Sequence, residues 1–443
     1  MKRVLAITAV ALVFAMSFAL VGCGSSNNIL NAGAANTTIS TGDGTLDSLV
    51  KCEVHFSALT LTGSGGTATT ANLLSKPAEV EFVHQAGTFE PLAVLNIPPG
   101  TYSGATFTAT SAEVVVMNTA VPPAPVSIPA TLSASTVSVT FPAPITISNT
   151  TSSQINFDMD LAGSVTLNGA PPTSATIAPK FNVTTSTVAN NGSEDGEIDD
   201  VHGAVTAINA PNFTIQTAQS TITFATDANT KFNNGITSLS SLKVGDIVEV
   251  DGMSKPDGSK LATKIEVEES SSGKEAEGVI TAVTGAPATQ VTFAHQVDSS
   301  NPASAPLTVD ATIGASTQFI VRADKLNPGS TPAFDASHIG KGQRIEVDAS
   351  GSTSPLAADK IKLREQALIG TVSAATASGF TLTLNSGSAF AALSGTTTVS
   401  VSIVSGTNLK VTPANAATVR VRGLVFVNGA AYSMVAARVD NNN

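Results

Sequence analysis

Apolar and polar residues alternate one by one along much of the chain, in short runs that end at glycine or proline. Examples are "VKCEVHFSALTL" from Val50, "TFTATSAEVVVM" from Thr106 and "QINFDMDL" from Gln154. A period of two places the apolar side chains on one face of a β-strand. The long runs of Glu, Lys and Leu that are typical of helices are absent. The pattern therefore predicts an all-β protein built from many short strands.

The first group of strands occupies residues 45–188, with Pro- and Gly-rich turns between them. Several short antiparallel strands of this kind indicate a β-sandwich. The most distinctive stretch is residues 95–116, in which a Pro-Pro-Gly turn precedes an unbroken strand from Tyr102.

This stretch, together with "INFDMDLAGSV" and "ATIAPKFNV", resembles an uncharacterised family of bacterial envelope lipoproteins. The resemblance implies a prealbumin-like sandwich and a location in the cell envelope. It implies no chemistry, because that family has no assigned activity.

The C-terminal half contains an internal repeat. Three segments begin alike, with a glycine and a strand: "HGAVTAINAPNFTIQT" from His202, "EGVITAVTGAPATQVTF" from Glu277 and "IGTVSAATASGFTLTL" from Ile369. Three segments also end alike, with a strand, a polar turn and a final strand whose apolar residues lie on one side: "VGDIVEVDGMSKPDGSKLATKIEVEE", "GKGQRIEVDASGSTSPLAADKIKLRE" and "ATVRVRGLVFVNGAAYSMVAARVDN". The repeat predicts three copies of one domain, at residues 201–269, 275–365 and 366–440.

The first copy shows the expected architecture best. Its short strands are connected through a Gly245-Asp246 turn and an Asp257-Gly258 hairpin signal. Several short strands with glycines at points of sharp curvature favour a small closed barrel like those that bind oligonucleotides or oligosaccharides, the OB type. The copy also resembles a second uncharacterised bacterial family of such barrels. We expect each copy to bury its own apolar face without help from a neighbour.

The N-terminal segment reads as a secretion and anchoring signal. Residues 1–22 have a short basic start and an uncharged apolar core, which is typical of a signal peptide. The core ends in "LVGC", which resembles the lipobox of bacterial lipoproteins and implies that Cys23 is acylated. An ordinary transmembrane anchor is the alternative, but the apolar segment is short for a span and a polar tract follows at once.

Two low-complexity stretches join the predicted units. Residues 23–44 are rich in Ser, Asn, Gly and Thr, and we interpret them as a flexible tether. Residues 189–200 are acidic, and we interpret them as a solvated linker. A calcium site in this linker is the alternative, but the spacing of its carboxylates does not match an EF-hand loop.

Composition limits the partners that we expect. The chain has a formal net charge of −11, no Trp and two Tyr. A basic groove and aromatic stacking platforms are what single-stranded nucleic acid requires, so we expect no nucleic acid partner. The expected partners are the membrane, through the lipid on Cys23, and an envelope protein or polysaccharide.

No constellation of residues indicates a catalytic or metal site. The histidines are scattered without metal-ligand spacing, and neither H-E-x-x-H nor G-x-S-x-G occurs. Cys52 lies on a predicted strand, where a buried, unreactive thiol is favoured over a catalytic one. Asp158 and Asp160 alternate with apolar residues, so both face one side, which we interpret as the solvent side. A bound cation there, or in the acidic linker, stays open.

Two classes of function remain. The first is a non-catalytic envelope lipoprotein that binds or scaffolds partners, without cofactor or metal, in the outer membrane if the host is Gram-negative. The second is an envelope hydrolase whose site is assembled from dispersed carboxylates. The absence of a recognisable nucleophile or metal motif favours the first, so we expect no enzymatic activity.

Overall fold

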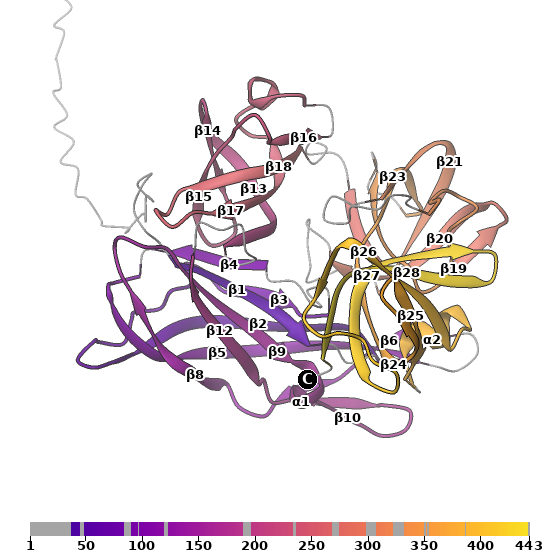
Figure 1. The fold of residues 1–443 in the computed structure, drawn as a ribbon, viewed down its shortest axis with the longest axis horizontal. Coiled ribbons are helices and arrows are strands. Elements are labelled where there is room, and N and C mark those ends of the chain that lie inside the picture. The colour runs from indigo at the N-terminus through magenta and orange to yellow at the C-terminus, as the bar shows by residue number, and fades with distance from the viewer. Residues whose placement is uncertain are drawn as a thin grey trace, which may run out of the picture.

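The computed structural model is an all-β molecule with one sandwich and three small barrels (Figure 1). This confirms the predicted fold class. The described residues are 37–44, 48–83, 90–95, 97–118, 123–188, 196–233, 236–267, 274–297, 307–321, 332–349, 351, 354–385 and 387–441. The predicted signal peptide and Cys23 lie outside them. Within the described residues, no helix is long and apolar enough to cross a membrane.

The sandwich is formed by twelve strands and one short helix. They are β1 (Thr37–Gly44), β2 (Leu49–Ser64), β3 (Ala78–Glu81), β4 (Glu90–Leu95), β5 (Gly100–Asn118), β6 (Ala124–Ile128), β7 (Ala130–Leu132), β8 (Thr136–Ile147), β9 (Ser153–Asp160), α1 (Leu161–Ser164), β10 (Val165–Asn168), β11 (Ser174–Ile177) and β12 (Phe181–Thr187). One sheet has the order β12-β9-β1-β4, a second has β3-β2-β5-β6 with β8 also paired to β5, and a third has β10-β11-β7. Their apolar faces share one core.

Strand β1 corrects the predicted boundary of the tether. Residues 37–44, assigned to a flexible tract on composition, pair in parallel with β9 and antiparallel with β4. Ile39 is fully buried, and the flanking Thr38 and Ser40 are buried too. Backbone hydrogen bonds on both sides can hold such a strand, and Thr is a favourable strand residue although it is polar.

Barrel 1 contains β13 (Glu197–Asn209), β14 (Asn212–Gln216), β15 (Thr221–Ala225), β16 (Lys231–Asn233), the short helix η1 (Leu239–Ser241), β17 (Ile247–Ser254) and β18 (Lys260–Val267). Its sheet has the order β15-β14-β13-β17-β18-β16, and a further pairing of β15 with β18 joins the two sides. Strand β13 begins at Glu197, so residues 197–200 of the predicted acidic linker are strand. Buried Ile198 pairs there with Gly252 of β17, which explains the correction. Residues 189–195 lie outside the described residues.

Barrels 2 and 3 are closed and share one strand order. Barrel 2 runs β19-β20-β21-β23-β22, and barrel 3 runs β24-β25-β26-β28-β27. Their elements are β19 (Lys274–Gly285), β20 (Ala288–Val297), β21 (Thr308–Val321), β22 (Arg344–Ala349), β23 (Leu356–Leu363), β24 (Gln366–Thr376), β25 (Gly379–Leu384), α2 (Ala389–Ser394), β26 (Thr398–Leu409), β27 (Thr418–Asn428) and β28 (Ala431–Asn441).

The glycines that open the three repeats have a common steric role. A Cβ atom at Gly203, Gly278 or Gly370 would come too close to a carbonyl oxygen of the neighbouring strand. Only glycine allows the first strand to curve so tightly against the second at this point. Gly245, in the turn predicted for copy one, has φ +97°, a left-handed conformation that also favours glycine.

The barrels differ in how independent their cores are. The core of barrel 1 is drawn from residues between Ile198 and Val267, and none of its described members belongs to a neighbouring domain. The core of barrel 2 also takes in Leu424, Phe426 and Val435 from β27 and β28 of barrel 3. Barrel 3 nevertheless has a core of its own, drawn from residues 368–439. The expectation that each copy buries its own apolar face is therefore confirmed for copies one and three and wrong in part for copy two, whose core continues into β27 and β28.

Candidate functional site

The closing hairpin of each barrel carries charged side chains on the face that points away from its own core. In barrel 1, Glu249 and Asp251 of β17 lie beside Lys264 and Glu266 of β18. The alternating Val248, Val250 and Ile265 point into the barrel. The alternation of the sequence thus predicts correctly which residues leave the core. It does not show that the outward face is buried as well.

Lys264 organises the charges of barrel 1. Its ammonium nitrogen lies 3.1 Å from a carboxylate oxygen of Glu249, 3.1 Å from one of Glu266 and 3.6 Å from one of Asp251. The side chains of Lys264 and Glu249 are 5% and 4% exposed, so these charges are removed from water.

Barrel 2 repeats the arrangement with more cations. Lys362 of β23 forms ion pairs with Glu346 and, at 3.3 Å, with Asp348 of β22. Arg364 lies 3.1 Å from the second oxygen of Glu346, and Arg344 forms an ion pair with Glu277 of β19. Glu346 is almost fully buried.

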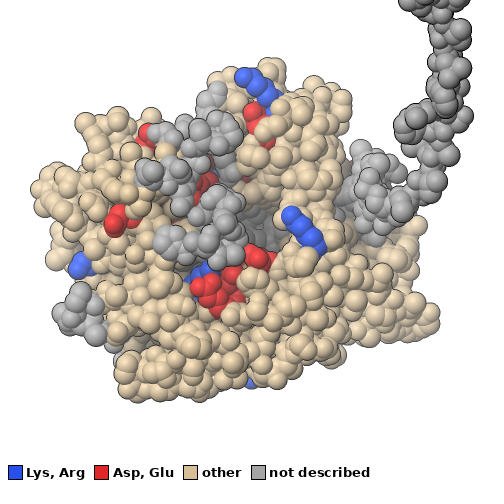
Figure 2. Space-filling model, turned by 180° about the vertical axis from the view of Figure 1, so that it is seen from behind, with Lys and Arg blue, Asp and Glu red and all other residues tan. Residues whose placement is uncertain are grey.

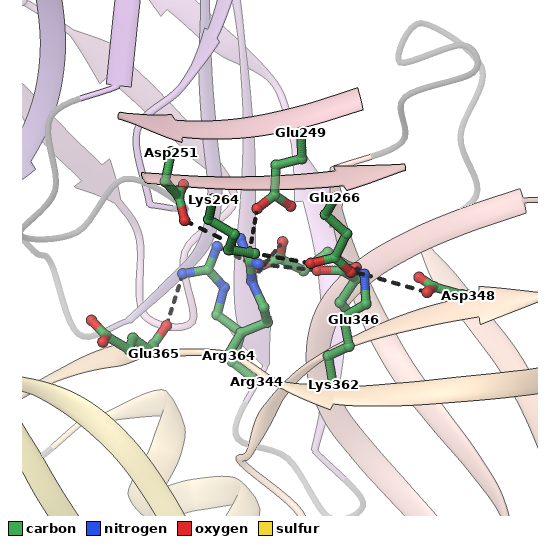
Figure 3. A network of polar contacts seen from close by, with 11 residues as sticks. Glu249, Asp251, Lys264, Glu266, Arg344, Glu346, Asp348, Lys362, Arg364 and Glu365 are labelled. Atoms are coloured by element: carbon green, nitrogen blue, oxygen red, sulfur yellow. Dashed lines mark hydrogen bonds and ion pairs between the residues drawn. The ribbon is translucent and has the colours of Figure 1, made fainter. Parts of the chain in front are cut away.

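Two ion pairs cross between barrels, and Figure 3 shows the residues of the first, Lys362 and Glu266. The ammonium of Lys362 lies 3.1 Å from a carboxylate oxygen of Glu266, which connects barrel 2 to barrel 1. The guanidinium of Arg422 in barrel 3 lies 2.6 Å from a carboxylate oxygen of Glu365, which follows barrel 2 directly. The charged faces of the hairpins thus meet in one interdomain network.

The network sets the charge states of its members. Burial alone would raise the pKa of Glu346, but Lys362 and Arg364 hold it below its usual range. Burial lowers the pKa of Lys362, yet the surrounding carboxylates, Glu346 first, leave it raised. Burial raises the pKa of Asp348 to about 7, a shift that Lys362 reduces and Glu346 increases. Opposite charges favour the ionised forms, whereas burial opposes them.

A hydrolytic site assembled from dispersed carboxylates would require several carboxylates to lie close together, and they do so at this junction. In each ion pair described here, however, the carboxylate is bound to a Lys or Arg side chain. Glu275, Glu346 and Asp348 come close enough to share a metal ion. Lys362, however, already pairs with both Glu346 and Asp348. The arrangement is that of a buried electrostatic joint between domains.

Charged side chains are correspondingly sparse on the outside. Figure 2 shows a face that is mostly uncharged, with one group of acidic side chains gathered near its centre. Only 12% of the residues are charged, and many of the charged residues that the structure describes, Lys264, Glu346 and Lys362 among them, are buried.

Asp158 and Asp160 do not act as a pair. Asp160 caps α1, where its Oδ1 accepts a hydrogen bond from the backbone N–H of Gly163 at 2.9 Å. Asp158 is half-buried, and burial raises its pKa while the charges of Arg420 and Arg438 in barrel 3 lower it. The interpretation that both face solvent is therefore only partly right, because Asp158 is half-buried and lies within the electrostatic influence of barrel 3.

The other predicted residues are dispersed. Cys52 is fully buried in the sandwich core, which confirms the predicted burial. Cys23 lies outside the described residues. So do Glu194 and Asp195 of the acidic linker.

Comparisons with known proteins match only part of the chain. A domain of unknown function, DUF5666, matches residues 202–266, which lie within barrel 1. None of the curated proteins matches the sequence. Drosophila Unr CSD456 is 14% identical, with 55% of this chain and 96% of that chain covered and a TM-score of 0.14. A multidomain protein with nucleic acid binding domains from Streptococcus pneumoniae TIGR4 is 11% identical, with 53% and 72% covered and a TM-score of 0.11.

The second likeness contradicts one expectation. The acidic total and the lack of aromatic platforms predict no nucleic acid partner, but this similar protein is described as carrying nucleic acid binding domains. The exclusion is withdrawn. Its physical weakness is that a total charge says nothing of position, and here Glu249, Glu266 and Glu346 are neutralised by buried cations.

The network is the feature that sequence reasoning missed. A signal was present, since both "IVEVDG" with "KIEVEE" and "RIEVDA" with "KIKLRE" alternate charge of both signs with apolar residues. Strands with charges of both signs usually face solvent on that side. The same charged pattern, however, recurs in the closing strands of successive repeats, and this recurrence indicates an interface between them.

Proposed function

We propose that this chain is a non-catalytic scaffold or binding protein whose barrels are held in fixed relative positions. The observation that carries the proposal is the ion pair between Lys362 and Glu266, which joins two barrels through buried charges. Buried ion pairs depend on exact geometry, so they favour one arrangement of domains over others. Fixed positions suit a protein that presents several surfaces together.

Contacts at the other joints support the same conclusion. Between barrels 2 and 3, the side-chain amide of Gln343 donates to the carbonyl of Val425 at 2.9 Å, and the Tyr432 hydroxyl donates to the carbonyl of Lys341 at 2.9 Å. Between sandwich and barrel 1, the Gly196 N–H donates to the side chain of Gln154 at 2.7 Å. Every domain is thus connected to another by polar contacts as well as by the chain.

A distance measurement tests the fixed arrangement. Spin labels on Thr263→Cys of barrel 1 and Ala357→Cys of barrel 2, both at exposed positions, report the separation of the two barrels. The carrier is the full mature chain with Cys23→Ser, in which the remaining native cysteine is buried. We expect one narrow distance distribution, and a broader one when Lys362→Met is added. A broad distribution without Lys362→Met would contradict the scaffold.

We also propose that the protein is anchored in the cell envelope by a lipid on Cys23, in the outer membrane of a Gram-negative host. The proposal is supported by the apolar core that ends in "LVGC" and by Gly24 after the cysteine. Two or more acyl chains hold a protein durably at a membrane. The tether after Cys23 would then carry the sandwich and the barrels.

Metabolic labelling with palmitate tests the anchor. Cys23→Ser is expected to abolish incorporation of label and processing of the precursor, because no thiol remains to accept the lipid. Cys52→Ser is the matched control, since Cys52 is buried in the sandwich and should not affect labelling. Equal labelling of the wild type and Cys23→Ser would overturn the proposal.

A further inference from the structure

A second polar cluster lies on the outward face of the sandwich, far in sequence from the barrels. Strands β2 and β3 pair antiparallel, with His55 opposite Glu79 and Glu53 opposite Glu81. Residues that face each other across two strands share one side of the sheet, as do residues two apart on one strand. Glu53, His55 and Glu79 therefore gather on one face, while the neighbouring Cys52, Val54 and Phe56 fill the core.

The imidazole lies between two carboxylates. Nε2 of His55 is 2.7 Å from Oε1 of Glu53, and Nδ1 is 3.4 Å from Oε1 of Glu79. One nitrogen and two oxygens from the three residues all lie within 4.8 Å of one another, close enough to be ligands of one ion. The side chain of His55 is 27% exposed and that of Glu79 is 39% exposed, so solvent reaches the cluster.

The surroundings fix one ligand and leave a negative charge. Lys51 lies 3.2 Å from Oε2 of Glu53 and 2.9 Å from Oε2 of Glu113. Glu53 is thereby held by its second oxygen, with Oε1 directed at His55. Glu53 and Glu113 share the ammonium of Lys51, and Glu79 and Glu81 lie on the paired strand β3. Negative charge therefore predominates in this part of the sheet and attracts a cation. The Glu81 carboxylate also accepts hydrogen bonds from the backbone N–H groups of Cys52 and Val83.

We propose that Glu53, His55 and Glu79 bind one Zn²⁺ ion. Imidazole nitrogen with carboxylate oxygen is a ligand set that suits zinc, which accepts three protein ligands and completes its shell with water. Calcium requires six or more oxygens, and magnesium a nearly ideal octahedron, which three side chains do not supply. The ion would replace the hydrogen bonds of His55 and connect strand β3 to strand β2.

Titration of the full mature chain with Zn²⁺ by isothermal calorimetry tests the site. We expect His55→Ala to remove one binding event or to weaken it about tenfold or more. Glu79→Gln, which keeps the shape and loses the charge, should weaken the same event. Circular dichroism of each variant establishes that the sandwich is folded.

The matched control is His338→Ala. His338 has the same side-chain exposure, 27%, and its Nδ1 lies 2.8 Å from a single carboxylate oxygen, of Asp335. Its loss should leave the event unchanged, since one histidine and one carboxylate are too few to form the site. No Zn²⁺ binding to the wild type, or equal binding to the wild type and His55→Ala, would overturn the proposal. So would an equal loss of binding in His338→Ala.

Discussion

The interior of the sandwich and the junction between barrels 1 and 2 are both buried, but the first is formed by apolar side chains and the second by charged ones. In the sandwich, the ring of Phe107 lies 5.1 Å from that of Phe56, 4.9 Å from that of Phe157 and 5.0 Å from that of Phe181, measured between centroids. At the junction, the corresponding central group is the ammonium of Lys362 among three carboxylates.

The two kinds of contact affect different properties: the stability of a domain and the orientation of one domain relative to another. Apolar burial stabilises a fold without requiring one exact geometry, because the hydrophobic effect is roughly proportional to buried area and has no direction. A buried ion pair gains little net free energy over an apolar contact, but it is strongly destabilising when one partner is lost. On the proposal above, the sandwich core accounts for folding of its domain, and the ion pairs orient barrel 1 relative to barrel 2.

Phe107→Ala should have the largest effect. It removes a ring from the centre of the aromatic cluster and leaves a cavity, so the free energy of unfolding of the sandwich should fall by about 3–5 kcal/mol. Urea denaturation followed by circular dichroism measures the loss. The loss should be independent of salt, because no charge is involved. A loss below about 1 kcal/mol would show that the cluster rearranges to fill the space.

Lys362→Met should have the next largest effect. It leaves Glu346, which is almost fully buried, with Arg364 as its remaining cation among the pairs described, so we expect a loss of about 3 kcal/mol in urea. Lys360→Met is the control: Lys360 is on the same strand and lies 3.9 Å from Asp348, a weaker contact. Its loss should be about 1 kcal/mol or less. Equal effects of the two variants would contradict a network centred on Lys362.

The sequence predicts the two regions unequally for physical reasons. The period of two shows which face of each strand is apolar, and this is enough for the all-β class, the sandwich and the three barrels. The sequence does not determine whether the outward face of a strand is exposed or buried. Glu266 beside Lys264 gives the same sequence pattern whether water or another barrel covers the two side chains. Strand β1 was missed because its burial comes from pairing with β4 and β9, not from apolar residues.

The smallest effect should come from Asp348→Asn, and its sign should depend on pH. Burial raises the pKa of Asp348 from 3.8 to about 7 in the folded protein, so its carboxyl group favours folding when protonated. That contribution is complete below pH 4 and is lost as the pH rises through 7. Asparagine cannot ionise, so between pH 5 and pH 8 the variant should gain stability relative to the wild type by on the order of 1 kcal/mol. The pKa of about 7 already includes the attraction of Lys362. Urea midpoints at the two pH values measure this difference. A difference between variant and wild type that does not change with pH would show that Asp348 is ionised throughout by its pairing with Lys362.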